Sequence, residues 1–337
     1  EIIAHRNEEQ ILEMEVFSQH LVLNERIDGL SVLRVIKRDF EDDYYINFDE
    51  ESFSSWISRN REFDTNILRY VYTSMTIPYS TYDYDMDKKE KLLLKRQEVI
   101  GGYSDQEYHS ERIYAQSRDG KRIPISLVYK KSLRSLETPQ NLILYGYGAY
   151  GSTEDPYFSS TRLSLLDRGF IFAIANVRGS QIFGRQSYDD GKLLKKKNTF
   201  FDFIDAGKFL INQNYTDKKH LFCYGGSAGG LLIGAVINME PDMWKGAIAS
   251  VPFVDVVTTG LDPTIPLTTY EWVEWGDPRE KEYYEYMLSY SPYDQVSNKE
   301  YPNLLVTAGF FDSSVQYWEP LKWVAKLRDH WVGDNEL

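Results

Sequence analysis

The stretch "CYGGSAGGLLIGAVI", residues 223–237, places one serine between two pairs of glycines and continues into an apolar run. Residues 225–229 fit the pattern G-x-S-x-G, with a predicted strand before them and a predicted helix over 228–238. Small residues permit a sharp strand-to-helix turn that projects the Ser227 hydroxyl above a sheet. The helix N-terminus behind it favours developing negative charge. The stretch therefore predicts that Ser227 is a nucleophile; a structural or phosphate-binding turn is the alternative.

Strands and helices alternate around this turn from about residue 110 onward. Apolar strands are predicted within 141–151, 169–179, 220–226, 246–252 and 303–312, and helices over 200–213, 228–238 and 317–331. A hairpin turning at 119–120 precedes them. This alternation predicts an α/β fold with a mostly parallel, doubly wound sheet covered on both faces, whose chemistry lies at the carboxyl ends of the strands.

Residues 1–108 follow a different pattern, that of an all-β unit. Short strands are separated by turn signals, including a hairpin at Asp28-Gly29 and two segments of 68–87 interrupted at Pro78. A sandwich, a barrel or propeller blades would all fit, and about 100 residues would form roughly two four-stranded blades. We therefore expect two domains, 1–108 and 109–337.

Composition narrows the possible partners and location. There are 38 basic and 51 acidic side chains, a net charge of −13, which disfavours nucleic acid and favours neutral or cationic ligands. The basic run "KLLKKKN", residues 192–198, is expected to be a solvated helix start. Cys223, the single cysteine, excludes an intrachain disulfide; we expect it to be a buried strand residue in a cytoplasmic protein.

The ends of the chain carry two further expectations. No apolar stretch approaches the roughly 20 residues of a membrane span, and the opening "EIIAHRNEEQ" lacks a signal-peptide pattern. It also lacks an initiating Met, which suggests that residue 1 is not the start of the gene product.

A nucleophilic serine needs a base and an orienting carboxylate, in the chain order serine, acid, histidine for this type of turn. Asp312 follows a predicted strand and is the expected acid, although it could instead cap the next helix. Asp255 and Asp262 are weaker alternatives. Of the five histidines only His330 follows Asp312, and it falls within a predicted amphipathic helix, where it is expected to be exposed or half-buried. The residues alone leave the triad without its histidine.

Longer segments carry a resemblance. "YGYGAYG", "NVRGS", "DGKLLKKKNTF", "YGGSAGG", "VPFVDVVTTGLDPTIPLTTYEW", "YSPYDQV" and "QYWEPLKWVAKLR" are similar to the prolyl oligopeptidase family of serine peptidases, in its branch that cleaves short peptides after Arg or Lys. The resemblance implies an α/β-hydrolase domain preceded here by the last blades of a β-propeller. It also implies that the chain is cut at both ends, with the catalytic histidine beyond Leu337.

The resemblance assigns roles to residues of this chain. Ser227 matches the nucleophile, Asp312 the acid, and the Tyr147 hydroxyl with the Ala228 N–H the oxyanion hole. Tyr147 could also be a stacked loop aromatic. No metal and no cofactor are implied.

The same resemblance implies which groups bind the substrate. Glu271 matches a carboxylate that pairs with a basic side chain, and a second family carboxylate meets Val273, with Glu274 next to it. Asp155 matches one of two aspartates that select a second basic residue, and Tyr157 stands at the other. A reduced preference for paired basic residues follows, unless Glu271 and Glu274 form only a solvated acidic face.

These implications predict a serine oligopeptidase of short basic peptides, inactive in residues 1–337 alone because the histidine is missing. Post-proline or esterase specificity on the same fold is one alternative, and a non-catalytic binding module is another. Oligomeric state is left open.

Overall fold

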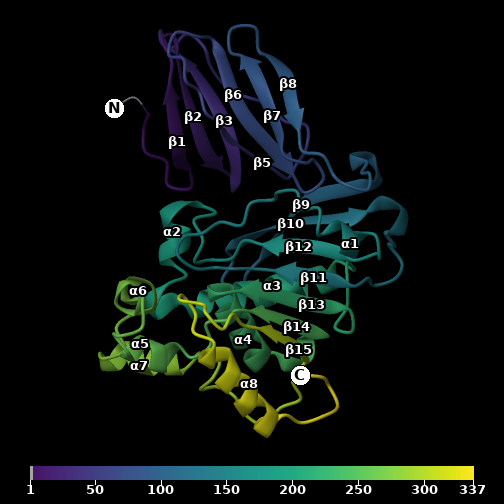
Figure 1. Cartoon of the computed structure of the whole chain (residues 1–337), viewed down its shortest axis with the longest axis vertical. Helices are drawn as coiled ribbons and strands as arrows, with labels where there is room; N and C mark the ends of the chain where they lie inside the picture. The colour runs from purple at the N-terminus through teal and green to yellow at the C-terminus, as the bar shows by residue number, and fades with distance from the viewer. Residues whose placement is uncertain (1–2) are drawn as a thin grey trace.

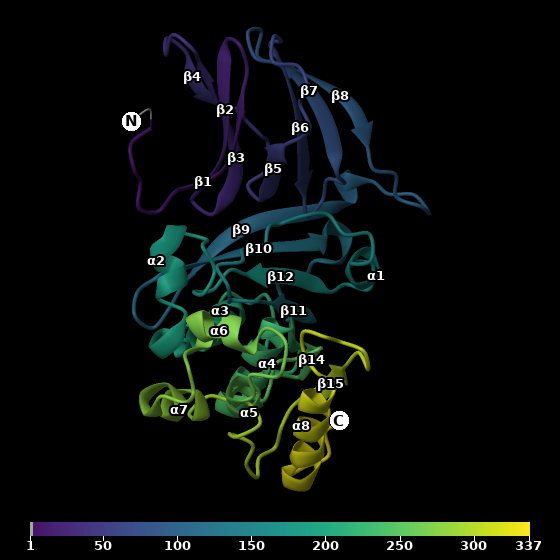
Figure 2. The same ribbon diagram turned by 60° about the vertical axis from the view of Figure 1, so that its left-hand side comes forward.

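The computed structural model describes residues 3–337, which form two β-sheets that follow each other along the chain. Figure 1 shows the first sheet in purple and blue above the second, whose strands run from teal to yellow among the helices. The same arrangement is visible after rotation in Figure 2.

The first sheet is built from two antiparallel groups of strands. Its order is β1-β2-β3-β5-β6-β7-β8, with β4 paired to β3. The only pairing between β3 and β5 within the described residues is the parallel bridge Ser31–Ser54, so the sheet divides into β1–β4 and β5–β8. The strands are β1 (Gln10–Val16), β2 (His20–Ile27), β3 (Leu30–Lys37), β4 (Asp43–Tyr45), β5 (Phe53–Ile57), β6 (Ile67–Ser74), β7 (Ser80–Asp85) and β8 (Glu90–Arg96). Four-stranded antiparallel groups of this kind are the units of β-propellers.

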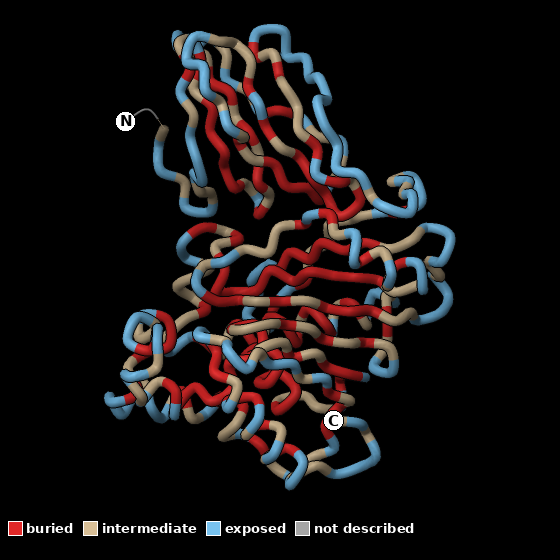
Figure 3. The backbone as a smooth tube through the Cα atoms, in the orientation of Figure 1, coloured by how far each residue is buried: buried red, intermediate tan, exposed pale blue. Residues whose placement is uncertain are grey.

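The local signals in this sheet are confirmed. β2 and β3 form a hairpin whose two turn residues, Asp28 and Gly29, both have positive φ, 47° and 78°; such turns match the twist of the flanking strands. Pro78 separates β6 from β7 as expected. Figure 3 shows buried segments along the inner strands, whereas every residue of β8 is exposed.

The second sheet has the order β15-β14-β13-β11-β12-β10-β9. The pairs from β12 to β15 are parallel, and β9 and β10 are added antiparallel at one edge. The prediction of a mostly parallel sheet is thus confirmed. Its strands are β9 (Tyr108–Gln116), β10 (Arg122–Lys130), β11 (Leu142–Tyr145), β12 (Ile171–Ala175), β13 (Leu221–Gly226), β14 (Gly246–Ser250) and β15 (Asn303–Thr307).

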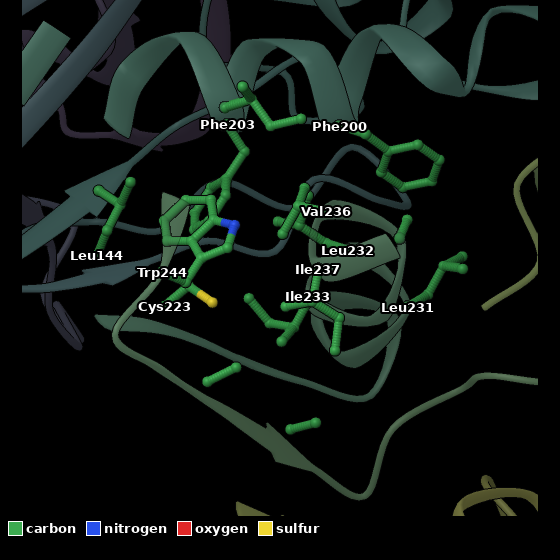
Figure 4. Packing of buried hydrophobic residues seen from close by; sticks show 14 of the residues in the cluster. Leu144, Phe200, Phe203, Cys223, Leu231, Leu232, Ile233, Val236, Ile237 and Trp244 are labelled. Carbon is green, nitrogen blue, oxygen red and sulfur yellow. The ribbon is translucent and has the colours of Figure 1, made fainter. Parts of the chain in front are cut away.

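Helices pack on the second sheet because this packing buries the apolar faces of both the sheet and the helices. They are α1 (Leu163–Leu166), α2 (Gly184–Asp189), α3 (Lys197–Asn212), α4 (Ala228–Met239), α5 (Val256–Leu261), α6 (Thr268–Trp275), α7 (Lys281–Leu288) and α8 (Trp318–His330). α4 is buried from residue 228 to 238 and packs with α3 in the main core. Figure 4 shows Phe203 and Trp244 beside Cys223 and residues of α4. Leu166 of α1 belongs to a separate cluster with Ile143 and Phe172.

Polar contacts join the two sheets. The Asp28 carboxylate accepts hydrogen bonds from Tyr114 Oη at 2.8 Å and Arg122 Nη2 at 2.9 Å, and the Asp28 carbonyl accepts one from Arg112 Nη2 at 2.8 Å. The β2–β3 turn is therefore docked on β9 and β10. Ser52 Oγ adds a buried bond to Ser126 Oγ at 2.8 Å.

Candidate active site

Ser227 occupies the junction between β13, which ends at Gly226, and α4, which begins at Ala228. Its backbone has φ 55° and ψ −119°, a conformation that non-glycine residues rarely adopt and that costs of order 1–3 kcal/mol. The Ser227 N–H donates to Ser250 O at 2.9 Å, and the Ser227 carbonyl accepts from Phe253 N at 3.1 Å. These bonds hold the strained turn against β14 and the loop that follows it.

The glycines beside the serine are required by close backbone contacts. A Cβ on Gly225 would lie 2.3 Å from Gly229 O, and a Cβ on Gly229 would lie 2.7 Å from Gly146 O. Real Cβ atoms do not approach so closely, so two of the four glycines in "GGSAGG" are needed where the turn meets its own helix and the loop after β11.

Tyr147 lies in that loop, immediately beyond β11, which pairs with β13. Burial raises the pKa of the Tyr147 phenol, and the neighbouring Ser227 hydroxyl opposes the effect. The structure thus brings Tyr147 and Ser227 together. Ala228 is the first residue of α4, so its N–H has no acceptor within the helix.

Glu271 is half-buried in α6 and is held by two aromatic side chains. Tyr150 Oη donates to its Oε1 at 2.8 Å, and Trp275 Nε1 donates to its Oε2 at 3.3 Å. Burial raises the pKa of Glu271, while these two hydrogen bonds lower it. The ring centroids of Tyr150 and Tyr147 lie 6.3 Å apart, which links the Glu271 carboxylate to the Ser227 region.

Glu274 lies one turn further along α6 but is only 1 % exposed. Its Oε1 accepts from the backbone N–H of Tyr150 at 3.0 Å and its Oε2 from Tyr188 Oη at 2.6 Å. Direct substrate binding by Glu274 is not supported by this geometry, because Glu274 is buried with both oxygens bonded internally, whereas Glu271, also bonded at both oxygens, is partly exposed. The alternative of a solvated acidic face is wrong for Glu274, because the side chain is buried. Val273, in contrast, is exposed.

Asp312 follows β15 at the same carboxyl edge as Ser227, since β13, β14 and β15 are parallel neighbours. Its Oδ1 accepts from Ser314 N at 2.8 Å and Val315 N at 3.0 Å. Among described residues, no hydrogen bond reaches Oδ2, so one oxygen is fixed while the other is free to accept a proton donor.

The other candidates for the triad are placed elsewhere. His330 is half-buried on α8, as expected, with Nδ1 3.0 Å from Lys326 O. Asp255 is buried, caps α5 through Thr258 N and pairs with Lys322. Asp262 bonds to Thr264 N at 2.9 Å. Asp255 is thereby not left as a free carboxylate, whereas Asp262 is bonded only through Oδ1 and lies at the end of α5 rather than after a strand of the sheet.

Asp155 already has a basic partner within the chain. Arg26, on β2, donates to Asp155 Oδ1 at 2.6 Å and Oδ2 at 3.1 Å. The Asp155 side chain is 28 % exposed, so a substrate cation at this carboxylate would compete with Arg26. Tyr157 is exposed nearby in sequence.

The basic run 192–198 departs from expectation at one residue. Lys195 is exposed, but Lys196 is fully buried, with Nζ 2.5 Å from Gly148 O. A solvated helix start is therefore wrong for Lys196, because the N-terminus of α3 packs against the Tyr147 loop. Cys223 is fully buried in β13, as predicted, and burial raises the pKa of its thiol.

Comparison with known proteins identifies the family. Residues 156–336, more than half of the chain, match the model described as the Prolyl oligopeptidase family. The chain belongs to the prolyl oligopeptidase family. Residues 1–97 match the N-terminal β-propeller domain of prolyl oligopeptidase. The expected combination of propeller blades with an α/β-hydrolase domain is confirmed.

This prolyl oligopeptidase family member is similar to curated proteins that are named as peptidases. It is 50 % identical over 329 residues to "Dipeptidyl aminopeptidase BI" of Pseudoxanthomonas mexicana, covering 97 % of this chain and 45 % of the relative. It is 44 % identical over 336 residues to "Protease 2" of Moraxella lacunata, covering 100 % and 48 %. The chain thus spans about half the length of these curated relatives.

Solved structures agree, and they confirm the similarity to the branch of the family that was expected. Oligopeptidase B from Leishmania major superposes with a TM-score of 0.92 at 43 % identity, covering 99 % of this chain and 48 % of that one. Oligopeptidase B from Trypanosoma brucei with covalently bound antipain superposes with a TM-score of 0.93 at 43 % identity, and the coverage of the two chains is the same.

Residues 3–337 contain neither a membrane-spanning helix nor a metal-binding cluster of side chains. No helix there is long and apolar enough to cross a membrane. No group of three or more His, Cys, Asp or Glu side chains in that range is placed to hold a metal ion.

The residues of this region that were not predicted include Tyr150, Lys196 and Arg26. Tyr150 had a local signal, since it follows Tyr147 by three residues in "YGYGAYG". Lys196 and Arg26 had none, because their partners Gly148 and Asp155 are distant in sequence.

Proposed function

We propose that this chain forms the Ser227-bearing part of a serine endopeptidase that hydrolyses short peptides after Arg or Lys. The observation that carries the proposal is the strained Ser227 turn with the Tyr147 phenol beside it and a half-buried carboxylate, Glu271, linked to Tyr147 through Tyr150. A partly exposed hydroxyl on a strained turn, flanked by proton donors, suits acyl transfer.

In the proposed reaction Ser227 Oγ attacks the peptide carbonyl, and its proton passes to a histidine. That histidine is proposed to lie outside residues 1–337, because His330 is bound within α8 and the curated relatives are about twice as long. Asp312 would orient it through the free Oδ2. The Tyr147 hydroxyl and the Ala228 N–H would donate to the oxyanion.

Selection of a basic side chain is assigned to Glu271. A guanidinium or ammonium leaving water needs an anionic partner, and burial already disfavours an unpaired charge at Glu271. Post-proline cleavage would call for an apolar, aromatic pocket instead. Asp155 is proposed to contribute little to binding a second basic residue while Arg26 occupies it.

Organisation and location are part of the same proposal. We take 1–108 as propeller blades and 109–337 as the hydrolase domain, supported by the change of sheet between β8 and β9. A cytoplasmic location is supported by the single, buried cysteine. Short basic peptides are the proposed substrates, because a chain with a net charge of −13 attracts positively charged ligands.

The proposal is tested with the protein expressed from its complete gene, using peptidyl-Arg and peptidyl-Pro p-nitroanilides. Ser227→Ala should abolish cleavage, and Glu271→Gln should lower kcat/KM for the Arg substrate about 100-fold, mainly through KM. Glu282→Gln, at an exposed glutamate of α7, is the matched control. Equal turnover of both substrates would contradict the specificity, and no Ser227-dependent hydrolysis would contradict the activity.

A second function is favoured by one relative, named a dipeptidyl aminopeptidase, at 50 % identity. Such an enzyme would release dipeptides from a free N-terminus. Ala-Arg p-nitroanilide with a free amine and its N-acetyl form distinguish the two functions. Cleavage of both supports the endopeptidase, whereas cleavage of the free amine alone supports the dipeptidyl activity.

A further inference from the structure

Lys196 is buried without a carboxylate in contact. It is 1 % exposed, and among residues 3–337 the one hydrogen bond of its Nζ goes to a backbone carbonyl rather than to a carboxylate. Its Nζ donates to Gly148 O and lies 5.0 Å from the centre of the Trp275 ring. Burial lowers its pKa to about 8, against the opposing effect of Glu274. Burying a lysine this way is costly, and an apolar residue would satisfy the packing at lower cost.

The segment that Lys196 contacts has an uncommon backbone conformation, which is strained at Tyr150. Gly148 has φ 72° and Tyr150 has φ 56°, two left-handed conformations within three residues. A Cβ on Gly148 would lie 2.4 Å from Thr199 Cγ2, so the start of α3 presses directly on this backbone. Strained segments persist only where their surroundings hold them.

A second buried charge holds the other end of the segment. Glu274 accepts the N–H of Tyr150, and Lys196 donates to the carbonyl of Gly148. Both bonds are charge-assisted, and such bonds are shorter and stronger than neutral ones. Tyr147 directly precedes Gly148, so the two bonds fix the backbone from which its phenol projects.

We propose that Lys196 and Glu274 are positioning residues for the Tyr147 hydroxyl, one holding the Gly148 carbonyl and the other the Tyr150 N–H. The inference rests on the proposed function, in which Tyr147 donates to the oxyanion. An oxyanion donor must be held to within about 0.5 Å, and two buried charges hold the loop more rigidly than apolar contacts would.

The first test measures steady-state kinetics of Lys196→Met in the complete gene product. The expected result is a kcat lowered about 10- to 100-fold with KM little changed, because misplacing a donor by about 1 Å costs that much. Lys195→Met is the matched control, since Lys195 is exposed and bonds only Asp190. Its kcat should match the wild type.

A double-mutant cycle separates positioning from general damage. If Lys196 acts through the Tyr147 hydroxyl, Lys196→Met should have less than a threefold effect once Tyr147→Phe has removed that hydroxyl. Equal losses in both backgrounds would overturn the proposal. Glu274→Gln, which keeps the side-chain size, goes through the same cycle if Lys196→Met does not fold.

Hydrogen exchange supplies a readout that does not depend on activity. Peptides covering residues 146–151 should exchange faster in Lys196→Met than in wild type or Lys195→Met, while α4 peptides stay unchanged. Unchanged exchange in 146–151 would overturn the proposed positioning of this loop by Lys196 and Glu274, even if the wild type proved inactive. A wild type without peptidase activity would contradict the proposed function. The exchange result would then decide by itself whether Lys196 and Glu274 hold the loop.

Discussion

Arg26 on β2 and Asp155 in the loop between β11 and α1 form a two-pronged ion pair, with N–O distances of 2.6 and 3.1 Å, although their positions differ by 129 in the chain. The pair joins the two sheets and neutralises a carboxylate close to Tyr157. Both side chains are shielded, with exposures of 7 % and 28 %, so we expect the pair to matter for stability and for substrate choice.

Arg26→Met should leave Asp155 unpaired. We expect a loss of about 1–3 kcal/mol in the free energy of unfolding, between the values for exposed and buried pairs. The freed carboxylate should also raise the preference for Arg-Arg over Ala-Arg substrates several-fold. Urea denaturation and kcat/KM ratios check both, with exposed Arg38→Met as the control. An unchanged ratio would show that Asp155 is remote from the substrate.

Ser227→Gly and Ser227→Ala should both be inactive but should differ in stability. The φ of 55° and ψ of −119° strain an alanine at this position but are open to glycine. We expect the glycine variant to unfold with a free energy about 1 kcal/mol higher than the alanine variant. Urea midpoints of the two proteins, measured side by side, test this. An alanine variant of equal or greater stability would refute the strain at this turn.

Acid should weaken the binding of basic substrates. Burial raises the pKa of Glu271 above its ordinary value of 4.5, so the carboxylate becomes protonated earlier than an exposed glutamate as pH falls from neutral. KM for a peptidyl-Arg substrate should rise over that range. Tyr150→Phe removes a hydrogen bond that lowers this pKa.

The rise in KM of Tyr150→Phe should therefore begin at higher pH than in the wild type. KM measured for both proteins over the acid range tests this, with Glu282→Gln again as the control. Superimposed KM–pH profiles for wild type and Tyr150→Phe would rule out Glu271 as the titrating group.

Glu319 on α8 should make stability fall with rising pH. It is 1 % exposed, and burial raises its pKa from 4.5 to about 7, although Val254 N, Asp255 N and Thr259 Oγ1 donate to it and oppose the change. Between these values the folded chain holds a proton that the unfolded chain releases. Stability is therefore highest near or below pH 4.5 for this group and declines up to about pH 7, by at most about 3 kcal/mol.

Glu319→Gln should flatten this part of the profile, because the amide keeps an acceptor for the backbone N–H groups and carries no charge. Urea denaturation at about pH 5 and about pH 8, for both proteins, measures the difference. A mutant that loses the same stability between the two pH values as the wild type would assign the slope to other groups.

Much of the fold could be predicted because its signals are local. The "GGSAGG" turn, the Asp28-Gly29 hairpin and the alternation of strands and helices each depend on residues next to one another. The position of Asp312 after a predicted strand made it a candidate, the resemblance added Tyr147 and Glu271, and Tyr147 does lie beside Ser227. The catalytic and substrate-binding roles of Tyr147, Glu271 and Asp312 stay predictions.

Glu274 and Asp155 show where sequence patterns stop being informative. Both are acidic and near expected binding groups, yet Glu274 is occupied by Tyr150 and Tyr188, and Asp155 by Arg26. Whether a carboxylate is free or already bound depends on side chains far away in sequence, which no local pattern records.

The sequence by itself determined the Ser227 turn, because a residue larger than glycine at 225 would collide with the carbonyl oxygen of Gly229, four residues away. It also determined the order of strands and helices along the chain through their apolar periodicity. The tertiary structure alone decided that Lys196 is buried against Gly148 and that Arg26 reaches Asp155. The physical reason is that burial and ion pairing depend on which segments the completed sheets bring together, whereas steric limits on the backbone act between neighbours.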